Sequence, residues 1–374
     1  QEPLLGGWLL SAPETEIEGR PALEWVAAAE AELARHPEVT LLRRTQCFGV
    51  YDHNFFALNE RVTDHLAESE RPDHLPRQRL WKLRARQVVY ATGAIERPLV
   101  FRDNDRPGIM LAGAAQTYLR RFGVRPGDKA VVFTNNDGGY GAALALHAAG
   151  GRVAAVVDLR EEPSGPLTEQ ARAAGLDIFA GHAVIGTDGG KRVTGCRIAP
   201  LDESGTRVFG GGTPLDCDLL VSSGGWSPTV HLFAQAKGQL VWDAAQACFV
   251  PGAATRPGQR VAGAANGAFE LARCLEQGHA AGLEAAAEAG FKAKGRKPAA
   301  PRGEAPGFLP ARFLYLVPSD TPLGEGGKHF GKTGNVNAIG IVAEQVGKPL
   351  PEVGVTTFRL PYTPVTFGTF AGRD

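Results

Sequence analysis

Apolar residues in this chain fall into short runs separated by helical stretches, and this alternation predicts an α/β fold. The run Lys129–Thr134 (KAVVFT) has the continuous apolar character of a strand buried in a core, and Arg152–Asp158 (RVAAVVD) repeats it. Between them, the small residues of Gly141–Ala149 predict a helix that ends in a Gly-Gly turn. Together the three elements span about thirty residues, the size of half a mononucleotide-binding fold.

Other segments predict the remaining elements. Extended segments are expected at 39–50, 55–62, 82–90, 218–222 and 260–264, with hairpin pieces at 182–187, 192–200 and 207–209. Helices are expected at 21–33, at 111–122, from the last strand to about 289, and at 336–346. Strands that alternate with helices predict parallel sheets.

The order of these elements predicts two Rossmann-like, FAD/NAD(P)-binding units, with the second inserted in the first. We expect the first unit at 1–100, the second at 101–250 and a return to the first at 251–293. The stretch 294–307 is rich in Lys, Arg, Pro and Ala and is interpreted as a linker, and 308–374 as a small C-terminal segment of helix and coil. A chain of 374 residues is too long for one ordinary core, which favours two or more packed units.

Composition narrows the classes of function. Lys plus Arg equals Asp plus Glu at 40 each, so no basic excess indicates nucleic acid as a partner. No apolar run is long enough to cross a bilayer, and no membrane partner is expected. The cysteines are scattered without a C-x-x-C pair, which is typical of reduced thiols in a cytoplasmic protein and argues against a zinc site: Cys47, Cys196, Cys217, Cys248 and Cys274.

The strongest chemical motif is the strand end Val88–Ala94 (VVYATGA). A strand that ends in Ala-Thr-Gly brings backbone close to a bound dinucleotide, and Gly93 lets the chain turn without a Cβ clash. The alternative interpretation is a plain turn at the end of a strand. The sequence Glu96-Arg97-Pro98, which follows the motif, favours the cofactor contact over this alternative. We therefore predict cofactor contacts at Thr92, Gly93 and Ala94, and at the N-terminal pair Gly6 and Gly7.

The turn after Lys129–Thr134 departs from a dinucleotide-binding loop. A working loop reads G-x-G-x-x-G and holds the pyrophosphate on backbone N–H groups at a helix N-terminus. Here Asn135 and Asp137 replace the glycines, and Asp137 is expected to act as the helix N-cap. Asp158 stands where a ribose-binding acid belongs, but without the glycines the pattern favours a unit that no longer binds dinucleotide.

The last predicted strand continues into VAGAANG at 261–267. In flavin reductases the matching strand ends in Gly-Asp, whose Asp meets the ribityl chain; Ala264 takes that place here, which weakens FAD as the ligand and leaves room for another dinucleotide. The alternative is that the glycines only allow a strand to pack closely on a helix. The predicted cofactor contacts are Gly263, Ala264, Asn266 and Gly267.

Other motifs carry no catalytic assignment. The histidines lie far apart without paired carboxylates, and Ser222 and Ser223 lack the G-x-S-x-G elbow of a hydrolase. The G-K-T at 331–333 lacks the first glycine and the preceding strand of a P-loop, so nucleotide hydrolysis is rejected. No catalytic residue and no metal ligand is therefore predicted in this chain.

Long stretches of the chain resemble the alpha subunit of heterotetrameric sarcosine oxidase, a flavoprotein with two dinucleotide-binding domains. The stretches that carry the resemblance are 85–124, 127–146, 218–243, 262–278 and 331–372. The flavoprotein subunits of opine oxidases, hydrogen cyanide synthases and amino-acid dehydrogenase complexes are more distant. They carry a Cys-rich iron–sulfur segment near the C-terminus, whereas this chain has no cysteine after Cys274.

The resemblance implies a division of labour between subunits. In that family the alpha subunit binds NAD, while the beta subunit carries FAD and the amine-oxidising site, which converts sarcosine to glycine and formaldehyde. A covalently held FMN at the interface of the two passes electrons to oxygen, giving hydrogen peroxide, and gamma and delta subunits complete the heterotetramer. The resemblance thus implies a cytoplasmic subunit of a flavin-dependent amine oxidoreductase, with NAD and interface FMN as cofactors and no activity in isolation.

For the flavin phosphate, the resemblance implies a C-terminal interface segment. Its candidate residues are Lys332, Thr333, Asn335, Arg359 and Thr363.

Three departures from the family affect the functional prediction. In the family, the first strand and its G-x-G-x-x-G loop precede the residue that matches Gln1. The family's folate-binding domain begins where this sequence ends, at Gly372–Asp374. The family also has additional residues between the positions that match Leu323 and Gly331. These features predict a truncated form of the subunit. They leave two alternatives: a cofactor-free structural or interaction module, and the flavoprotein subunit of an opine or amino-acid dehydrogenase.

Overall fold

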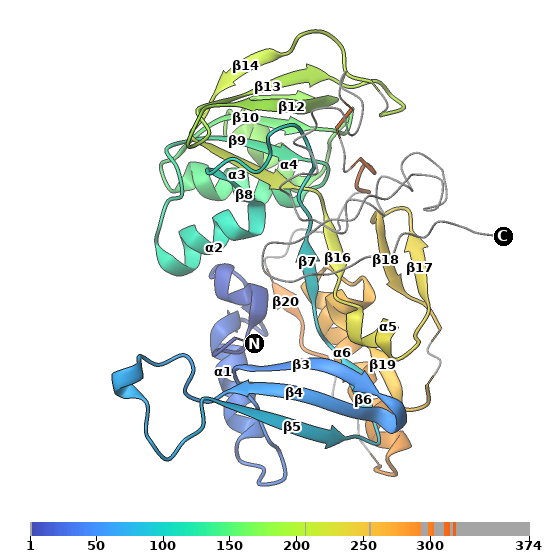
Figure 1. Ribbon diagram of the computed structural model, residues 1–374. Coiled ribbons are helices and arrows are strands. Elements are labelled where there is room, and N and C mark those ends of the chain that lie inside the picture. The colour runs from blue at the N-terminus through green and yellow to red at the C-terminus, as the bar shows by residue number, and fades with distance from the viewer. Residues whose placement is uncertain are drawn as a thin grey trace, which may run out of the picture. The chain divides into compact units, whose positions relative to one another are not determined.

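The computed structural model describes residues 2–205, 207–253, 256–292, 298–302, 310–314 and 317–318. The chain forms two compact units (Figure 1). Unit 1 comprises Gln1–Ile95, Ser227–Asp243 and Cys248–Gly307, and unit 2 comprises Glu96–Trp226, Ala244–Ala247 and Phe308–Asp374. Along the sequence, unit 2 therefore interrupts unit 1.

Unit 2 is built on a five-stranded sheet in which all neighbouring strands are parallel. Its order is β11 (Ile178–Ala180), β10 (Arg152–Asp158), β9 (Lys129–Thr134), β15 (Leu219–Ser223) and β8 (Ile109–Leu111). Its helices are α2 (Ala112–Phe122), α3 (Gly138–Ala148) and α4 (Pro166–Ala173). An antiparallel sheet of β12 (His182–Asp188), β13 (Gly195–Pro200) and β14 (Thr213–Asp216) lies on the face opposite the helices (Figure 1).

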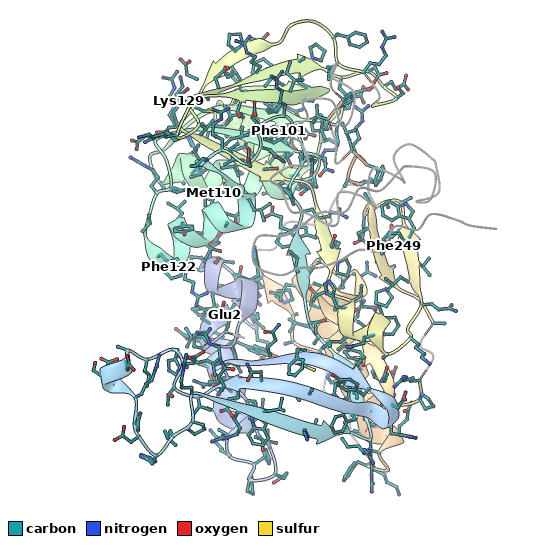
Figure 2. The ribbon with its side chains drawn as sticks, in the orientation of Figure 1. Glu2, Phe101, Met110, Phe122, Lys129 and Phe249 are labelled. Atoms are coloured by element: carbon teal, nitrogen blue, oxygen red, sulfur yellow. The ribbon has the colours of Figure 1, made fainter. Side chains whose placement is uncertain are left out.

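Burial on both faces explains the continuous apolar run of β9. Val132 packs with residues of α2, α3 and α4 in one hydrophobic cluster. Phe133, the next residue, points to the other face because successive strand side chains alternate. There its ring meets Phe101, which is labelled in Figure 2, edge to face with centroids 5.7 Å apart, and both side chains are fully buried.

The described part of unit 1 contains small sheets, α-helices and short 3-10 helices. The antiparallel sheet is β3 (Thr45–Tyr51), β4 (Phe55–Arg61) and β5 (Gln78–Arg84), and β6 (Val88–Tyr90) pairs in parallel with β19 (Gln259–Val261). A hairpin is formed by β17 (Leu240–Asp243) and β18 (Cys248–Pro251), and a further sheet by β2 (Arg20–Pro21), β1 (Glu16–Ile17) and β20 (Pro301–Arg302). The helices are α1 (Ala22–Leu33), α5 (His231–Gln235) and α6 (Leu271–Glu288).

Short elements complete the description. The 3-10 helices are η1 (Gly7–Ser11), η2 (Asp52–Asn54), η3 (Glu68–Glu70) and η4 (Gly263–Asn266). Two further strands, β7 (Ala94–Glu96) and β16 (Trp226–Pro228), pair with each other and contain two of the points where the chain passes between the units.

The structure corrects several predicted elements. The single strand expected at 82–90 is two strands, β5 and β6, which belong to different sheets because the chain leaves the hairpin sheet at Ala85. The strand expected at 207–209 makes only one bridge, between Leu201 and Val208, and β14 is the third strand of that sheet. The helix expected at Gly141 already begins at Gly138. The helix expected at 336–346 lies outside the described residues.

Removing the Phe133 ring tests this account of unit 2. Phe133→Ala is expected to lower the free energy of unfolding by about 3–5 kcal/mol, because a fully buried aromatic side chain leaves a cavity. Phe122→Ala is the matched control in the same unit, since the Phe122 side chain is 60% exposed, and its expected change is within about 0.5 kcal/mol. Denaturant titration of both variants measures this. Equal losses in the free energy of unfolding in the two variants would contradict the buried packing of Phe133.

Candidate functional site

The parallel pairing of β6 and β19 brings two predicted cofactor motifs together. Tyr90, the last residue of β6, lies opposite Val261 of β19, and the backbone N–H of Ala262 donates to the Tyr90 carbonyl at 3.0 Å. Because the strands are parallel, the A-T-G turn and the G-A-A-N-G turn follow from the same edge of the pair. We call Thr92–Ala94 and Gly263–Gly267 the strand-end site.

Gly93 has the backbone that a close approach to a ligand requires. Its φ of +75° lies in the left-handed region that favours glycine, and a Cβ added there would meet no atom within 4 Å. The turn is held by Thr229, whose N–H donates to the Gly93 carbonyl at 2.9 Å and whose carbonyl accepts from Thr92 Oγ1 at 2.7 Å. The Thr92 hydroxyl thus has a partner within unit 1, and Gly93 borders open space.

The second half of the site is held by helix α6. Gln277 Oε1 accepts from the N–H of Gly263 at 3.0 Å and from Asn266 Nδ2 at 3.2 Å. One turn earlier on the helix, the Cys274 thiol contacts the carbonyl of Ala268 at 2.9 Å. Gln277 was not predicted from the sequence, because its role depends on which face of α6 lies against the turn.

The other residues predicted to bind cofactor do not lie in the described part of the strand-end site. Gly6 has a φ of +119° at the start of η1, and a Cβ there would meet Leu23 of α1 at 3.4 Å. The Gly6 carbonyl accepts from the N–H of Leu9 in η1, and a Cβ at Gly7 would meet no atom within 4 Å. The residues proposed for the flavin phosphate lie outside the described part of the chain: Lys332, Thr333, Asn335, Arg359 and Thr363.

In unit 2, the turn after β9 is filled by its own side chains. Asn136 Oδ1 accepts from the N–H of Gly138 at 2.8 Å, in the first turn of α3, and Asn136 Nδ2 donates to the Ser223 carbonyl at 3.0 Å. Asp137 occupies the N-cap position of α3, as predicted, but its side chain makes no capping hydrogen bond, and Asn136 supplies the acceptor for the Gly138 N–H instead.

The Asp137 and Asp158 carboxylates bind one guanidinium. Arg160 donates to Asp137 at 2.8 Å and to Asp158 at 2.9 Å, and all three side chains are at least nine-tenths buried. The Tyr140 hydroxyl donates to Asp158 at 2.9 Å, and burial together with Asp158 raises the pKa of Tyr140. Asp158, which stands at the position of a ribose-binding acid in the sequence, thus bonds to Arg160 and Tyr140 of its own unit.

Glu96 is a further buried carboxyl group that the sequence reasoning did not predict. Its Oε2 accepts from the N–H of Gly113 in the first turn of α2 at 2.6 Å, and Ser223 Oγ donates to its Oε1 at 2.8 Å. Burial raises the pKa of Glu96 to about 7, against the opposing effect of these two hydrogen bonds. The helix N-terminus of α2, where an anion is favoured, thus holds a carboxyl group of the protein.

Among the described residues, no helix is both long and apolar enough to cross a membrane. The described residues also contain no group of three or more His, Cys, Asp or Glu side chains arranged to hold a metal ion.

The chain is similar in sequence to known proteins. Residues 323–373 match the family model described as the sarcosine oxidase A3 domain. The chain is 39% identical to the sarcosine oxidase subunit alpha of Corynebacterium sp. (strain P-1) over an alignment of 414 residues. It is 37% identical to that of Rhizobium meliloti (strain 1021) over an alignment of 403 residues. The chain is a homologue of sarcosine oxidase alpha subunits. The matches cover 98% and 99% of this chain but only 42% and 39% of the two relatives, so the chain spans about two-fifths of their length.

Solved structures confirm the Rossmann-like α/β fold expected from the sequence. The crystal structure of L-proline dehydrogenase from P. horikoshii matches 99% of this chain and 73% of its own, with a TM-score of 0.55 and 19% identity. The crystal structure of thioredoxin reductase from T. acidophilum matches 76% of this chain and 86% of its own, with a TM-score of 0.51 and 15% sequence identity. At these identities the likeness concerns the fold.

The buried Glu96 predicts a pH dependence. Its pKa is higher in the folded chain than in the unfolded one, so the folded state binds the proton more tightly. The stabilisation is present below about pH 4.5 and is lost as the pH rises through about 7, a change of about 3 kcal/mol. Glu96→Gln, which carries no titrating group, is expected to remove this slope.

Urea unfolding between pH 5 and pH 8 measures the effect. Glu162→Gln is the control, because Glu162 is exposed in the same unit and its substitution is expected to keep the wild-type slope. A Glu96→Gln variant whose stability still falls as in the wild type would show that Glu96 does not cause the pH dependence.

Proposed function

We propose that this chain is the NAD-binding core of the alpha subunit of a sarcosine oxidase, and that NAD binds at the strand-end site of unit 1. The observation that supports this most is the parallel pairing of β6 with β19, which sets both glycine turns at one edge. Ligands of open α/β sheets bind outside the carboxyl ends of strands, where these turns lie. Homology to sarcosine oxidase alpha subunits over nearly the whole chain gives the cofactor a functional context.

The residues of the strand-end site fit a dinucleotide on chemical grounds. Gly93, Gly263 and Gly267 have φ values of +75°, +71° and +75°, and glycine at such positions lets backbone approach a ligand without a Cβ. The open space beside Gly93 could accept a group of the cofactor. Gln277 would position the Gly263 turn and would not itself touch the cofactor.

Unit 2 is not proposed as a cofactor site. The groups that would face a dinucleotide there already have partners within the unit: Asn136 caps α3, and Asp158 binds Arg160 and Tyr140. A ligand would have to displace these buried hydrogen bonds, each of which contributes about 1 kcal/mol or more.

The chemistry of the whole complex belongs to this proposal as well. We propose that the demethylation of sarcosine to glycine, formaldehyde and hydrogen peroxide takes place in a cytoplasmic heterotetramer with beta, gamma and delta subunits, and that the amine chemistry occurs in the beta subunit. An FMN at the interface with beta would be held through Lys332, Thr333, Asn335, Arg359 and Thr363. The match of residues 323–373 to the A3 domain family supports this part of the proposal. FMN bound there would supply electron transfer to oxygen.

A cofactor-free module derived from the same subunit is the second candidate. It is favoured by the partners that already engage the Thr92 hydroxyl and the Gly263 N–H, because both groups would otherwise face a ligand. An opine or another secondary amine in place of sarcosine is a variant of the first candidate, since substrate choice would lie in the partner subunit.

Gly93→Val separates the candidates. In the full-length alpha subunit of the purified complex, valine at Gly93 is expected to place its side chain in the cofactor's space and to reduce bound NAD by about tenfold or more. NAD released on denaturation, measured per alpha subunit, gives the readout.

Gly175→Val is the matched control. Gly175 has a φ of +74° and also has no atom within 4 Å of an added Cβ, so its substitution causes the same backbone strain away from the site. Full NAD content in the Gly93 variant would place the cofactor elsewhere. A wild-type complex that releases no NAD would favour the cofactor-free module.

A further inference from the structure

The parallel sheet of unit 2 has one edge where a ligand is expected. From β9 the chain continues to β10 on one side, while β15 and β8 lie on the other, so the strand order reverses between β9 and β15. Doubly wound sheets bind their ligands outside the carboxyl ends of the strands at such a reversal. In this unit that edge carries Asn135 after β9 and Leu159 after β10.

A segment from the far end of the described chain lies on this edge. The N–H of Arg312 donates to the Asn135 carbonyl at 3.1 Å, and Asn135 Nδ2 donates to the Arg312 carbonyl at 2.8 Å. The Arg312 guanidinium reaches the end of the neighbouring strand and donates to the Leu159 carbonyl at 2.6 Å. We call residues 310–314 and 317–318 the C-terminal strap.

The strap is bound firmly into unit 2. The Arg312 guanidinium also donates to the carbonyls of Asp202 and Glu203 at 2.7 and 2.6 Å and lies 3.7 Å from the Glu161 carboxylate. Leu314 is 1% exposed, and the N–H of the buried Val317 donates to the Val100 carbonyl at 2.8 Å. Backbone pairing, a buried leucine and a guanidinium with several acceptors are features of a permanent contact.

The chemistry of the edge favours this segment over an anionic cofactor. Three backbone carbonyls and a carboxylate surround the guanidinium, a set of acceptors that suits a cation and repels phosphate. The Asn135 carbonyl and side-chain amide, which face this edge, both pair with the strap backbone. Without Arg312, the carbonyls of Leu159, Asp202 and Glu203 would lose this donor, which destabilises any of them that stays buried.

We infer that the ligand edge of unit 2 is a docking site for the chain's own C-terminal strap, which occupies the place of a dinucleotide. The occupant is thus a segment of this chain, and Arg312 is its main anchor. This inference concerns unit 2 and stands independently of NAD binding in unit 1.

Hydrogen exchange on the full chain, followed by mass spectrometry, tests the inference. In the wild type, the amides of Arg312 and Val317 are expected to exchange slowly, because both are bonded within unit 2. Arg312→Ala is expected to raise exchange across the strap and at residues 135 and 159–161 by about tenfold or more. Arg312→Lys keeps the charge without the planar fork and is expected to give an intermediate rate.

Arg207→Ala is the matched control, since Arg207 is an exposed arginine of the same unit. Amide exchange across the strap in this variant is expected to equal that of the wild type. If Arg312→Ala unfolds unit 2, the Arg312→Lys variant and the wild-type amides still decide the matter. Unprotected amides at 312 and 317 in the wild type, or an Arg312→Lys strap as slow as the wild type, would overturn the inference. So would millimolar NAD that speeds exchange at Val317, because the edge would then accept a cofactor in competition with the strap.

Discussion

The parallel arrangement of β9, β10 and β15 exposes the carboxyl ends of the strands at one edge, and the polar groups buried there must find partners. In a dinucleotide-binding unit the ligand supplies some of those partners. Here they come from the protein: Asn136 and Ser223 bond to each other across the reversal, and Arg160 joins Asp137 to Asp158. The fold of unit 2 is that of a cofactor-binding domain, while its interactions at this edge are those of a protein core.

Unit 1 shows the opposite use of the same backbone geometry. Its two glycine turns also follow parallel strands, but Gly93 borders open space and no bulky side chain replaces the glycines. Thr229 and Gln277 hold these turns through hydrogen bonds, and Gln277 already accepts from the Gly263 N–H, whereas the space beside Gly93 stays open. This difference in side chains, on similar strand ends, is what separates a candidate cofactor site from a closed edge.

The sequence predicted the parts of this structure that depend on neighbouring residues. The strand Arg152–Asp158 and the helix that ends at Phe122 were predicted with nearly correct bounds, because continuous burial and a following glycine both leave local patterns. The break between β5 and β6 was missed, since only the sheets that the two segments join distinguish them from one long strand. The order of strands, which creates the reversal in unit 2, is likewise a property of the whole fold.

The candidate site shows the same limit more sharply. Thr92, Gly93 and Gly263 could be predicted because glycine turns after apolar strands form a recognisable motif. Gln277, Glu96 and Arg312 could not, because each bonds to a group outside its own element: Gln277 to Gly263, 14 residues away, Glu96 to Ser223, 127 residues away, and Arg312 to Asn135, 177 residues away. A polar residue that satisfies a buried group elsewhere carries no local signal, since any position of the right reach and polarity would serve. It follows that sequence motifs predict where a unit of this kind could bind a ligand, whereas the long-range partners of the same turns determine whether that space is left for one.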